Sequence, residues 1–164
     1  MNILSLESNN YLFFQPKILG SSVGEFDMEG FCEKLNEYLQ TEFEYKRKHA
    51  YTSPVSSTLV AHTKMFDLYF RWLPISQSWK NNTLVIARIG FKNTRIGHGT
   101  RLVQFLCKQA RKFGVEYIGI ESANSNSVEF GRKLGFELVS ERNWHLSVFA
   151  LSENIESRLA ESKV

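Results

Sequence analysis

The segment Thr83–Leu106 constrains this chain most, because an apolar run with the composition of a strand leads through a glycine turn into an amphipathic helix. The turn holds Gly97 and Gly99, which lack a Cβ atom and let a ligand approach the backbone amides closely. A helix that begins here directs its unpaired N–H groups and the positive end of its dipole at an anion in the turn. The segment therefore predicts a phosphate cradle, although glycine turns also occur where a chain only bends.

The size and charge of the chain limit the alternatives. Its 164 residues suffice for one domain with a sizeable core but not for two of ordinary size, so we expect a single domain over residues 1–164. Hydrophobic residues make up 43% and charged residues 23%, which is a globular composition. A net charge of +3 is too mild to predict a nucleic-acid binder without a concentrated basic patch, but it suits an anionic cofactor.

Cysteine and histidine usage argues against disulfides and metals. Cys32 and Cys107 are the two cysteines, and both lie in apolar helical patterns, so we expect buried free thiols. The four histidines show no ligand spacing, and no metal site is predicted. The N-terminus lacks the features of a signal peptide, and no apolar run reaches membrane-spanning length. We therefore expect a soluble cytoplasmic protein without a membrane partner.

Hydrophobic periodicity predicts a mixed α/β fold. Asp27 is a suitable N-cap for an amphipathic helix that runs to about Glu42. Glycines at 114 and 135 are placed to end two later helices. Strands are predicted at 12–14, 57–63, 66–73, 83–91, 115–120, 136–140 and 144–151, and helices at 99–113, 125–134 and from residue 152 onward. This order predicts one mixed β-sheet flanked by helices.

Two motifs and the order of elements resemble the GNAT superfamily of N-acetyltransferases. The loop Thr94-Arg95-Ile96-Gly97-His98-Gly99 resembles the family's Arg/Gln-x-x-Gly-x-Gly/Ala, with Thr94 in the leading position and Arg95 one place late. The segment from Asn124 to Phe136 resembles the family's asparagine followed by a short helix ending in Lys-Leu-Gly-Phe. The resemblance covers most of the chain and is sharpest over residues 83–136.

The resemblance implies a GNAT-like fold and an acyl-CoA-dependent N-acetyltransferase. Such an enzyme transfers an acetyl group from acetyl-CoA to a primary amine by direct attack in a ternary complex. The residues implied in CoA binding are Ile89, Phe91, Thr94, Arg95, Ile96, Gly97, His98, Gly99, Thr100 and Asn124. Asn124 is expected to contact the pantetheine or phosphate portion. The acceptor stays open between a small molecule, a protein and an aminoacyl-tRNA.

Catalysis requires a neutral amine, whereas a lysine-like amine has a pKa of about 10.4 and is protonated at neutral pH. Glu121 is the leading candidate for the base, because in the family this strand end lies beside the splayed opening of the sheet. The alternative is a solvated carboxylate at a strand end. Ser122 is a second candidate that could relay protons through water. The backbone N–H of Ile89 is expected to polarise the thioester carbonyl.

One departure from the family concerns the general acid. Many members carry a tyrosine in the short helix that protonates the departing thiolate, and Gly131 stands at the matching position here. A CoA thiol with a pKa near that of cysteine, roughly 8.5, leaves without full acid assistance, so activity should be reduced but not abolished. The alternative function is a catalytically weak or silent acyl-CoA-binding module. For His98 we expect contact with phosphate or simple exposure, not catalysis.

The run Tyr45–Tyr51 mixes basic and aromatic residues as nucleic-acid-binding surfaces do. A solvated charge run between a helix and a strand is the commoner explanation, and nucleic acid is not the expected partner. A nucleotide-binding protein is disfavoured because no Gly-Lys-Ser/Thr follows the glycine turn. Exposed edges near the final strands favour a homodimer.

Overall fold

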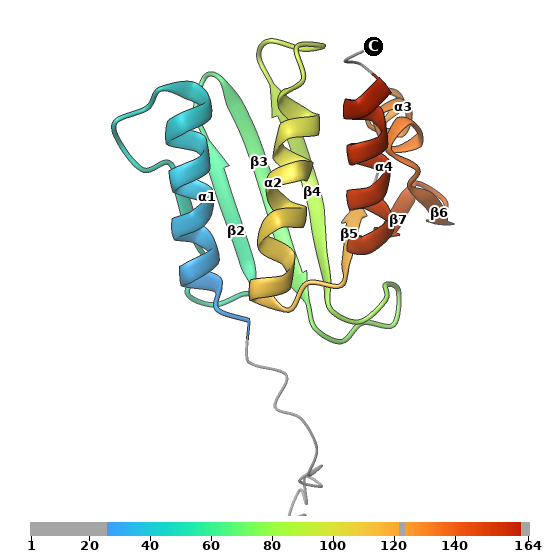
Figure 1. Ribbon diagram of the computed structural model, residues 1–164. Helices are drawn as coiled ribbons and strands as arrows, with labels where there is room; N and C mark the ends of the chain where they lie inside the picture. The colour runs from blue at the N-terminus through green and yellow to red at the C-terminus, as the bar shows by residue number, and fades with distance from the viewer. Residues whose placement is uncertain (1–25, 122–123, 162–164) are drawn as a thin grey trace, which may run out of the picture.

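The computed structural model describes residues 26–121 and 124–161 (Figure 1). The helices are α1 (Met28–Phe43), α2 (His98–Phe113), α3 (Ser125–Leu134) and α4 (Val148–Glu161). The strands are β1 (Ala50–Thr52), β2 (Thr58–His62), β3 (Phe66–Leu73), β4 (Thr83–Phe91), β5 (Tyr117–Ile120), β6 (Glu137–Ser140) and β7 (Asn143–Ser147).

Within the described residues the strands form one seven-stranded sheet in the order β1-β2-β3-β4-β5-β7-β6. The β4–β5 pair is parallel, and the other neighbours are antiparallel. Parallel neighbours need a crossover connection, which α2 supplies. The mixed sheet with its helices confirms the predicted fold class.

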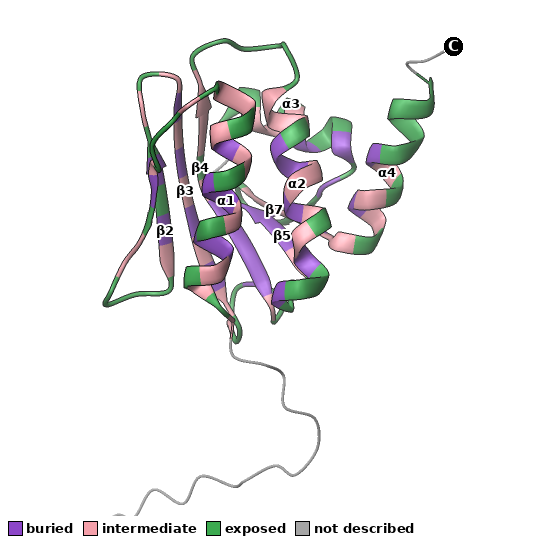
Figure 2. Cartoon of the chain, turned by 60° about the vertical axis from the view of Figure 1, so that its left-hand side comes forward, coloured by how far each residue is buried: buried purple, intermediate pink, exposed green. Residues whose placement is uncertain are grey.

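Helices α1, α2 and α4 lie side by side over one face of the sheet (Figure 1). Figure 2 shows that buried residues gather between these helices and the strands. Strand β3 has the predicted alternation, with four apolar side chains buried in the core: Phe66, Leu68, Phe70 and Trp72. Burying such a side chain contributes about 1.5–3 kcal/mol, so the shared core holds the helices in place and fixes where their ends meet the sheet.

Local signals set most helix ends as predicted. The Asp27 carboxylate caps α1 by accepting a hydrogen bond from the Gly30 amide at 2.8 Å. Gly114 follows α2 with a φ of +69°, a left-handed conformation that favours glycine, and its N–H donates to the Ala110 carbonyl. Gly135 ends α3 in the same conformation. These helices therefore begin and end within a residue or two of their predicted bounds.

Strand β1 was not predicted, and a buried side chain of α1 holds it. The Asn36 amide donates to the Ala50 carbonyl at 3.0 Å and accepts from the N–H groups of His49 and Ala50, both at 2.9 Å. Buried backbone polar groups need such partners. The basic run therefore does connect α1 to a strand, and its Lys48 pairs with Glu33 on α1.

The predicted strand over residues 144–151 is wrong in its second half. Strand β7 ends at Ser147, and α4 begins at Val148, four residues before the predicted tail helix. Apolar residues in this segment fit both periodicities, and the helical one prevails because Leu151 and Ile155, four apart, are both buried in the core. The predicted strand at 12–14 lies outside the described residues.

The loop between β3 and β4 buries an aromatic side chain against the sheet. Its Trp79 is buried, and a Cβ atom added to Gly119 of β5 would lie 2.6 Å from the Trp79 ring. The glycine thus makes room for the indole, and Trp79 packs against the sheet.

In the described part of the chain, no helix combines the length and apolar character needed to cross a bilayer.

Candidate functional site at the N-termini of two helices

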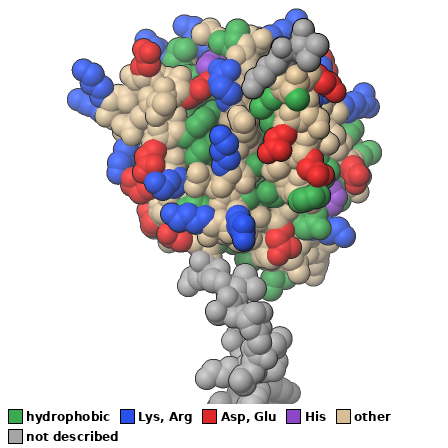
Figure 3. All heavy atoms as spheres, in the orientation of Figure 1, with side chains coloured by type: hydrophobic (Ala, Val, Ile, Leu, Met, Phe, Trp, Pro, Cys, Tyr) green, Lys and Arg blue, Asp and Glu red, His purple; other side chains and the backbone are tan. Residues whose placement is uncertain are grey.

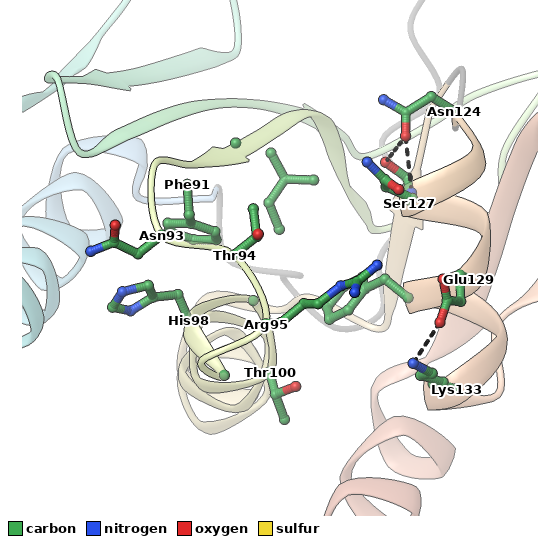
Figure 4. Close-up of a pocket in the computed structure, with 16 residues that line it drawn as sticks. Phe91, Asn93, Thr94, Arg95, His98, Thr100, Asn124, Ser127, Glu129 and Lys133 are labelled. Carbon is green, nitrogen blue, oxygen red and sulfur yellow. Dashed lines mark hydrogen bonds and ion pairs between the residues drawn. The ribbon is translucent and has the colours of Figure 1, made fainter.

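A hollow of about 950 Å³ lies between the end of β4, the loop after it, the first turn of α2 and helix α3 (Figure 4). The structure brings together at this hollow all the predicted cofactor-binding residues except Ile96: Ile89, Phe91, Thr94, Arg95, Gly97, His98, Gly99, Thr100 and Asn124. Ile96 is exposed. The lining also includes residues that sequence reasoning missed: Gly90, Asn93, Asn126, Ser127, Glu129, Phe130 and Lys133.

The sheet opens beside this hollow. The pairing of β4 with β5 ends at Ile86, whose carbonyl accepts from the Glu121 N–H at 3.1 Å, whereas β4 stays paired with β3 as far as Phe91. The Lys92 N–H donates to Met65 on the β3 side. Because backbone directions alternate along a strand, Ile89 and Phe91 direct their N–H and C=O groups away from β3, toward the opening.

The first turn of α2 suits an anion. Gly97, with a φ of +88°, is the N-cap, and no side chain in the described residues caps this helix. Helix α3 differs, since the Asn124 side chain accepts hydrogen bonds from the Ser127 N–H at 3.0 Å and the Ser127 hydroxyl at 3.2 Å. The first amides of α2 therefore face the hollow without a side-chain acceptor, and the helix dipole adds positive potential there.

Three charged side chains lie at the rim. Figure 4 shows that the Arg95 side chain extends toward α3, where Lys133 pairs with Glu129 at 2.7 Å. The hydrogen bond and charge of Lys133, with the charge of Arg95, lower the pKa of Glu129. Two cations thus lie near one carboxylate beside the uncapped turn, and Lys133 pairs with it. The i,i+4 spacing of Glu129 and Lys133 was the sequence signal for this pair.

The structure corrects the prediction of simple exposure for His98. Only 10% of its side chain is exposed, and Nδ1 lies 2.6 Å from Oε1 of Glu42. The ring packs against those of Phe43 and Phe91, at centroid separations of 4.7 and 5.3 Å. Figure 4 shows the side chain pointing away from α3. The position between two glycines gave no sign of this distant partner.

The candidate base Glu121 is not a solvated carboxylate. It pairs with Arg71 of β3, and the two side chains are only 26% and 35% exposed. A neighbouring cation favours the ionised form of a carboxylate. It also pairs with an oxygen that a base would use to accept a proton. Glu121 is not among the residues that line the hollow. Its role as a base stays a prediction, and the second candidate, Ser122, lies outside the described residues.

Gly131 lies on the buried side of α3. A Cβ atom there would be 3.5 Å from Cδ1 of Ile120 and 3.5 Å from Cβ of Phe136, which is ordinary van der Waals contact. The space at this position therefore admits a small side chain, although a large one would have to pass between Ile120 and Phe136.

The molecular surface shows mixed charge on the face that carries the helices. Lys and Arg side chains are interspersed there with Asp and Glu (Figure 3). Within the described residues, His, Cys, Asp and Glu side chains form no group of three or more that could hold a metal ion.

Several solved structures resemble this chain in fold. An acetyltransferase of the GNAT family from Staphylococcus aureus Mu50 is 12% identical, with 73% of this chain and 94% of that chain covered at a TM-score of 0.44. A KacTA–DNA complex is 15% identical, with 90% and 93% covered at 0.46. A variant of the AtaT toxin, bound to the C-terminus of the antitoxin AtaR and acetyl-CoA, is 16% identical, with 63% and 71% covered at 0.44.

No protein-family model matches the sequence, and no curated protein sequence matches it significantly. An acetyltransferase of the GNAT family is thus among the solved structures to which this chain is similar.

Proposed function

We propose that this protein is an acyl-CoA-dependent N-acetyltransferase, which transfers an acetyl group from acetyl-CoA to a primary amine by direct attack in a ternary complex. One observation carries the proposal. A single hollow joins the uncapped N-terminus of α2 to the stretch of β4 that has separated from β5. An anion site and an open strand edge side by side suit a long ligand with phosphates at one end and amides along its arm.

The pyrophosphate and the pantetheine arm of CoA each have a counterpart in this hollow. The pyrophosphate would bind the first amides of α2, at residues 97–100, where Arg95 and Lys133 add positive charge. The pantetheine arm contains amide groups, which could pair with the outward-facing backbone of Ile89 and Phe91 much as an added strand would. Asn124 uses its side-chain oxygen to cap α3, so its amide NH₂ group is the part directed to the ligand.

The transfer itself needs few side chains. The amine nitrogen attacks the thioester carbonyl carbon, a C–N bond forms, and the C–S bond breaks with its electron pair going to sulfur. In our proposal the Ile89 N–H stabilises the oxygen that becomes negative during this step. Glu121 takes the proton that the amine loses, or Ser122 relays that proton through water. Gly131 offers no acid, so the thiolate leaves unassisted and is protonated by solvent.

The alternative is an acyl-CoA-binding module with weak or no chemistry. Two observations favour it: Glu121 is held by Arg71, which weakens its case as a base, and Gly131 has no proton to give. Both functions predict that the hollow binds acyl-CoA. They differ in turnover.

The test has two stages. Calorimetry with acetyl-CoA should show saturable binding by the wild-type protein, and its absence would contradict both functions. A panel of amines assayed for free CoA thiol should then show turnover that Glu121→Gln reduces. Binding without turnover for any amine would favour the module instead. The protein's own thiols should add little signal, because burial raises the pKa of Cys32 to about 11 and also raises that of Cys107.

We also propose that residues 1–164 form one acetyltransferase domain, since one core cluster contains side chains from every helix and most of the strands of the described chain. The amine acceptor, a homodimer and a cytoplasmic location stay predictions from the sequence.

A further inference from the structure

We propose that Glu42 is a positioning residue for the cofactor cradle, because it holds His98 and Arg101 and through them the shape of the turn at residues 96–99. The three side chains form what we call the Glu42 cluster, at the junction of the C-terminal end of α1 with the N-terminal end of α2. The inference rests on the proposed function, in that the cradle is taken to bind CoA phosphates.

Glu42 is enclosed, and its Oε1 contacts both partners. Its side chain is 14% exposed, whereas both partners of the Lys133–Glu129 pair are more than half exposed. Oε1 accepts a hydrogen bond from Nε of Arg101 at 2.7 Å and lies 2.6 Å from Nδ1 of His98. Nδ1 of His98 also lies 3.0 Å from Nη2 of Arg101, so all three side chains of the cluster are in mutual contact. Charge-assisted bonds of this length are the stronger kind.

Arg101 carries the connection from Glu42 into the turn. Its Nη1 donates to the carbonyl of Ile96 at 3.0 Å, so one planar guanidinium spans the carboxylate and the backbone of the loop. Gly97 makes this reach possible, because a Cβ atom there would lie 2.7 Å from Nη1. The glycine of the turn is therefore needed for more than its positive φ. It also leaves the space that Arg101 occupies when it donates to the Ile96 carbonyl.

His98 makes the second connection. Its ring packs against Phe43 of α1 and Phe91 at the end of β4, and the two phenyl rings also stack on each other at 6.0 Å between centroids. The contact with Glu42 sets the orientation of the imidazole against these rings. The cluster thus holds the first turn of α2 in place from a side chain, Glu42, that does not itself line the hollow.

A purely structural role would also explain an ion cluster between two helices. The structural role and the positioning role predict different effects on ligand binding when the link is removed. A link that only stabilises α1 against α2 affects every ligand equally when it is removed. A link that shapes the phosphate cradle affects CoA and spares a donor that lacks phosphates, because that donor depends on the β4 edge alone.

The experiment compares the wild-type protein with Glu42→Gln, which keeps the size of the side chain and removes its charge. Glu37→Gln is the matched control on the same helix, since Glu37 pairs with the neighbouring Lys34 at the surface. The dissociation constants of CoA and of S-acetylpantetheine, which has no pyrophosphate, are measured for all three proteins. We expect Glu42→Gln to weaken CoA binding about tenfold or more, which is the effect expected when one charge-assisted hydrogen bond is lost. The affinity for S-acetylpantetheine should stay unchanged.

Arg101→Lys is the second variant, which keeps the charge and loses the planar fork. It should show the same selective loss of CoA affinity. The double variant Glu42→Gln, Arg101→Lys should lose less CoA affinity than the product of the two single losses, because both residues act through one turn. Equal loss for both ligands, or unchanged CoA affinity in Glu42→Gln, would overturn the positioning role. If the wild-type protein does not bind CoA, the proposed function fails instead.

Discussion

The ring of Phe130 on α3 lies against Gly99 in the first turn of α2, so closely that a Cβ atom on Gly99 would come 3.1 Å from Cε2 of the ring. The two motifs that stand about 30 residues apart in the sequence therefore meet at this contact. Both residues line the hollow. The width of the hollow at this point depends on glycine at position 99.

Gly99→Leu should accordingly act on ligand binding. The added side chain has to displace the Phe130 ring, and overpacking of this kind costs about 1–3 kcal/mol of unfolding free energy. We expect calorimetry to show at least a tenfold loss of CoA affinity in protein that remains folded. Gly99→Leu with Phe130→Ala should recover part of that affinity. Wild-type CoA affinity in Gly99→Leu alone would show that this contact does not bound the binding site.

Gly97→Ala and Gly114→Ala form a matched pair for stability. Both glycines have a positive φ, of +88° and +69°, so alanine at either position costs about 1–2 kcal/mol in backbone strain. Gly114 has nothing within 4 Å of an added Cβ atom, whereas at Gly97 the atom meets Nη1 of Arg101 at 2.7 Å. Urea denaturation should therefore show the larger loss for Gly97→Ala. In an Arg101→Met background the difference should shrink; a difference that persists there would mean that Arg101 is not its cause.

Asn36→Leu should strongly destabilise the protein. The buried amide makes three hydrogen bonds to the backbone of residues 49 and 50, and each buried group left without a partner costs about 1–3 kcal/mol. Gln40→Leu is the control on the same helix, because Gln40 makes one exposed bond to the Lys46 carbonyl. We expect a loss of about 2–5 kcal/mol for Asn36→Leu and under about 1 kcal/mol for Gln40→Leu. Similar losses for the two would contradict the anchoring of β1 by Asn36.

Glu42 should make stability depend on pH in the acid range. Burial by itself would raise the pKa of Glu42, but hydrogen bonds from Arg101 and His98, and their charges, outweigh it and lower the pKa below the usual value. A lowered folded-state pKa means that the stabilisation is complete above the unfolded pKa, about 4.3, and is lost as the pH falls through the lower folded value. The melting temperatures of wild-type and Glu42→Gln proteins should differ by a constant amount near pH 6 and converge below about pH 4. A gap that is unchanged at low pH would refute this.

Much of the fold could be predicted because its signals are local. Helix α3 has its predicted bounds, since Asn124 caps one end and Gly135 ends the other, and each acts on amides or carbonyls within a few residues. Strand β3 follows from a strict alternation of apolar and polar side chains. Strand β1 was missed because it has three residues and depends on Asn36, a side chain 14 positions away.

The sequence by itself determined the glycine turn, the helix that follows it and the asparagine that begins α3, and hence the kind of ligand to expect. Only the tertiary structure decided that His98 contacts Glu42, that Arg71 holds Glu121, and that Phe130 lies on Gly99. Capping and periodicity act within a few residues of one element. Contacts between residues 31 to 56 positions apart depend instead on how the helices pack on the sheet, and no local pattern encodes them.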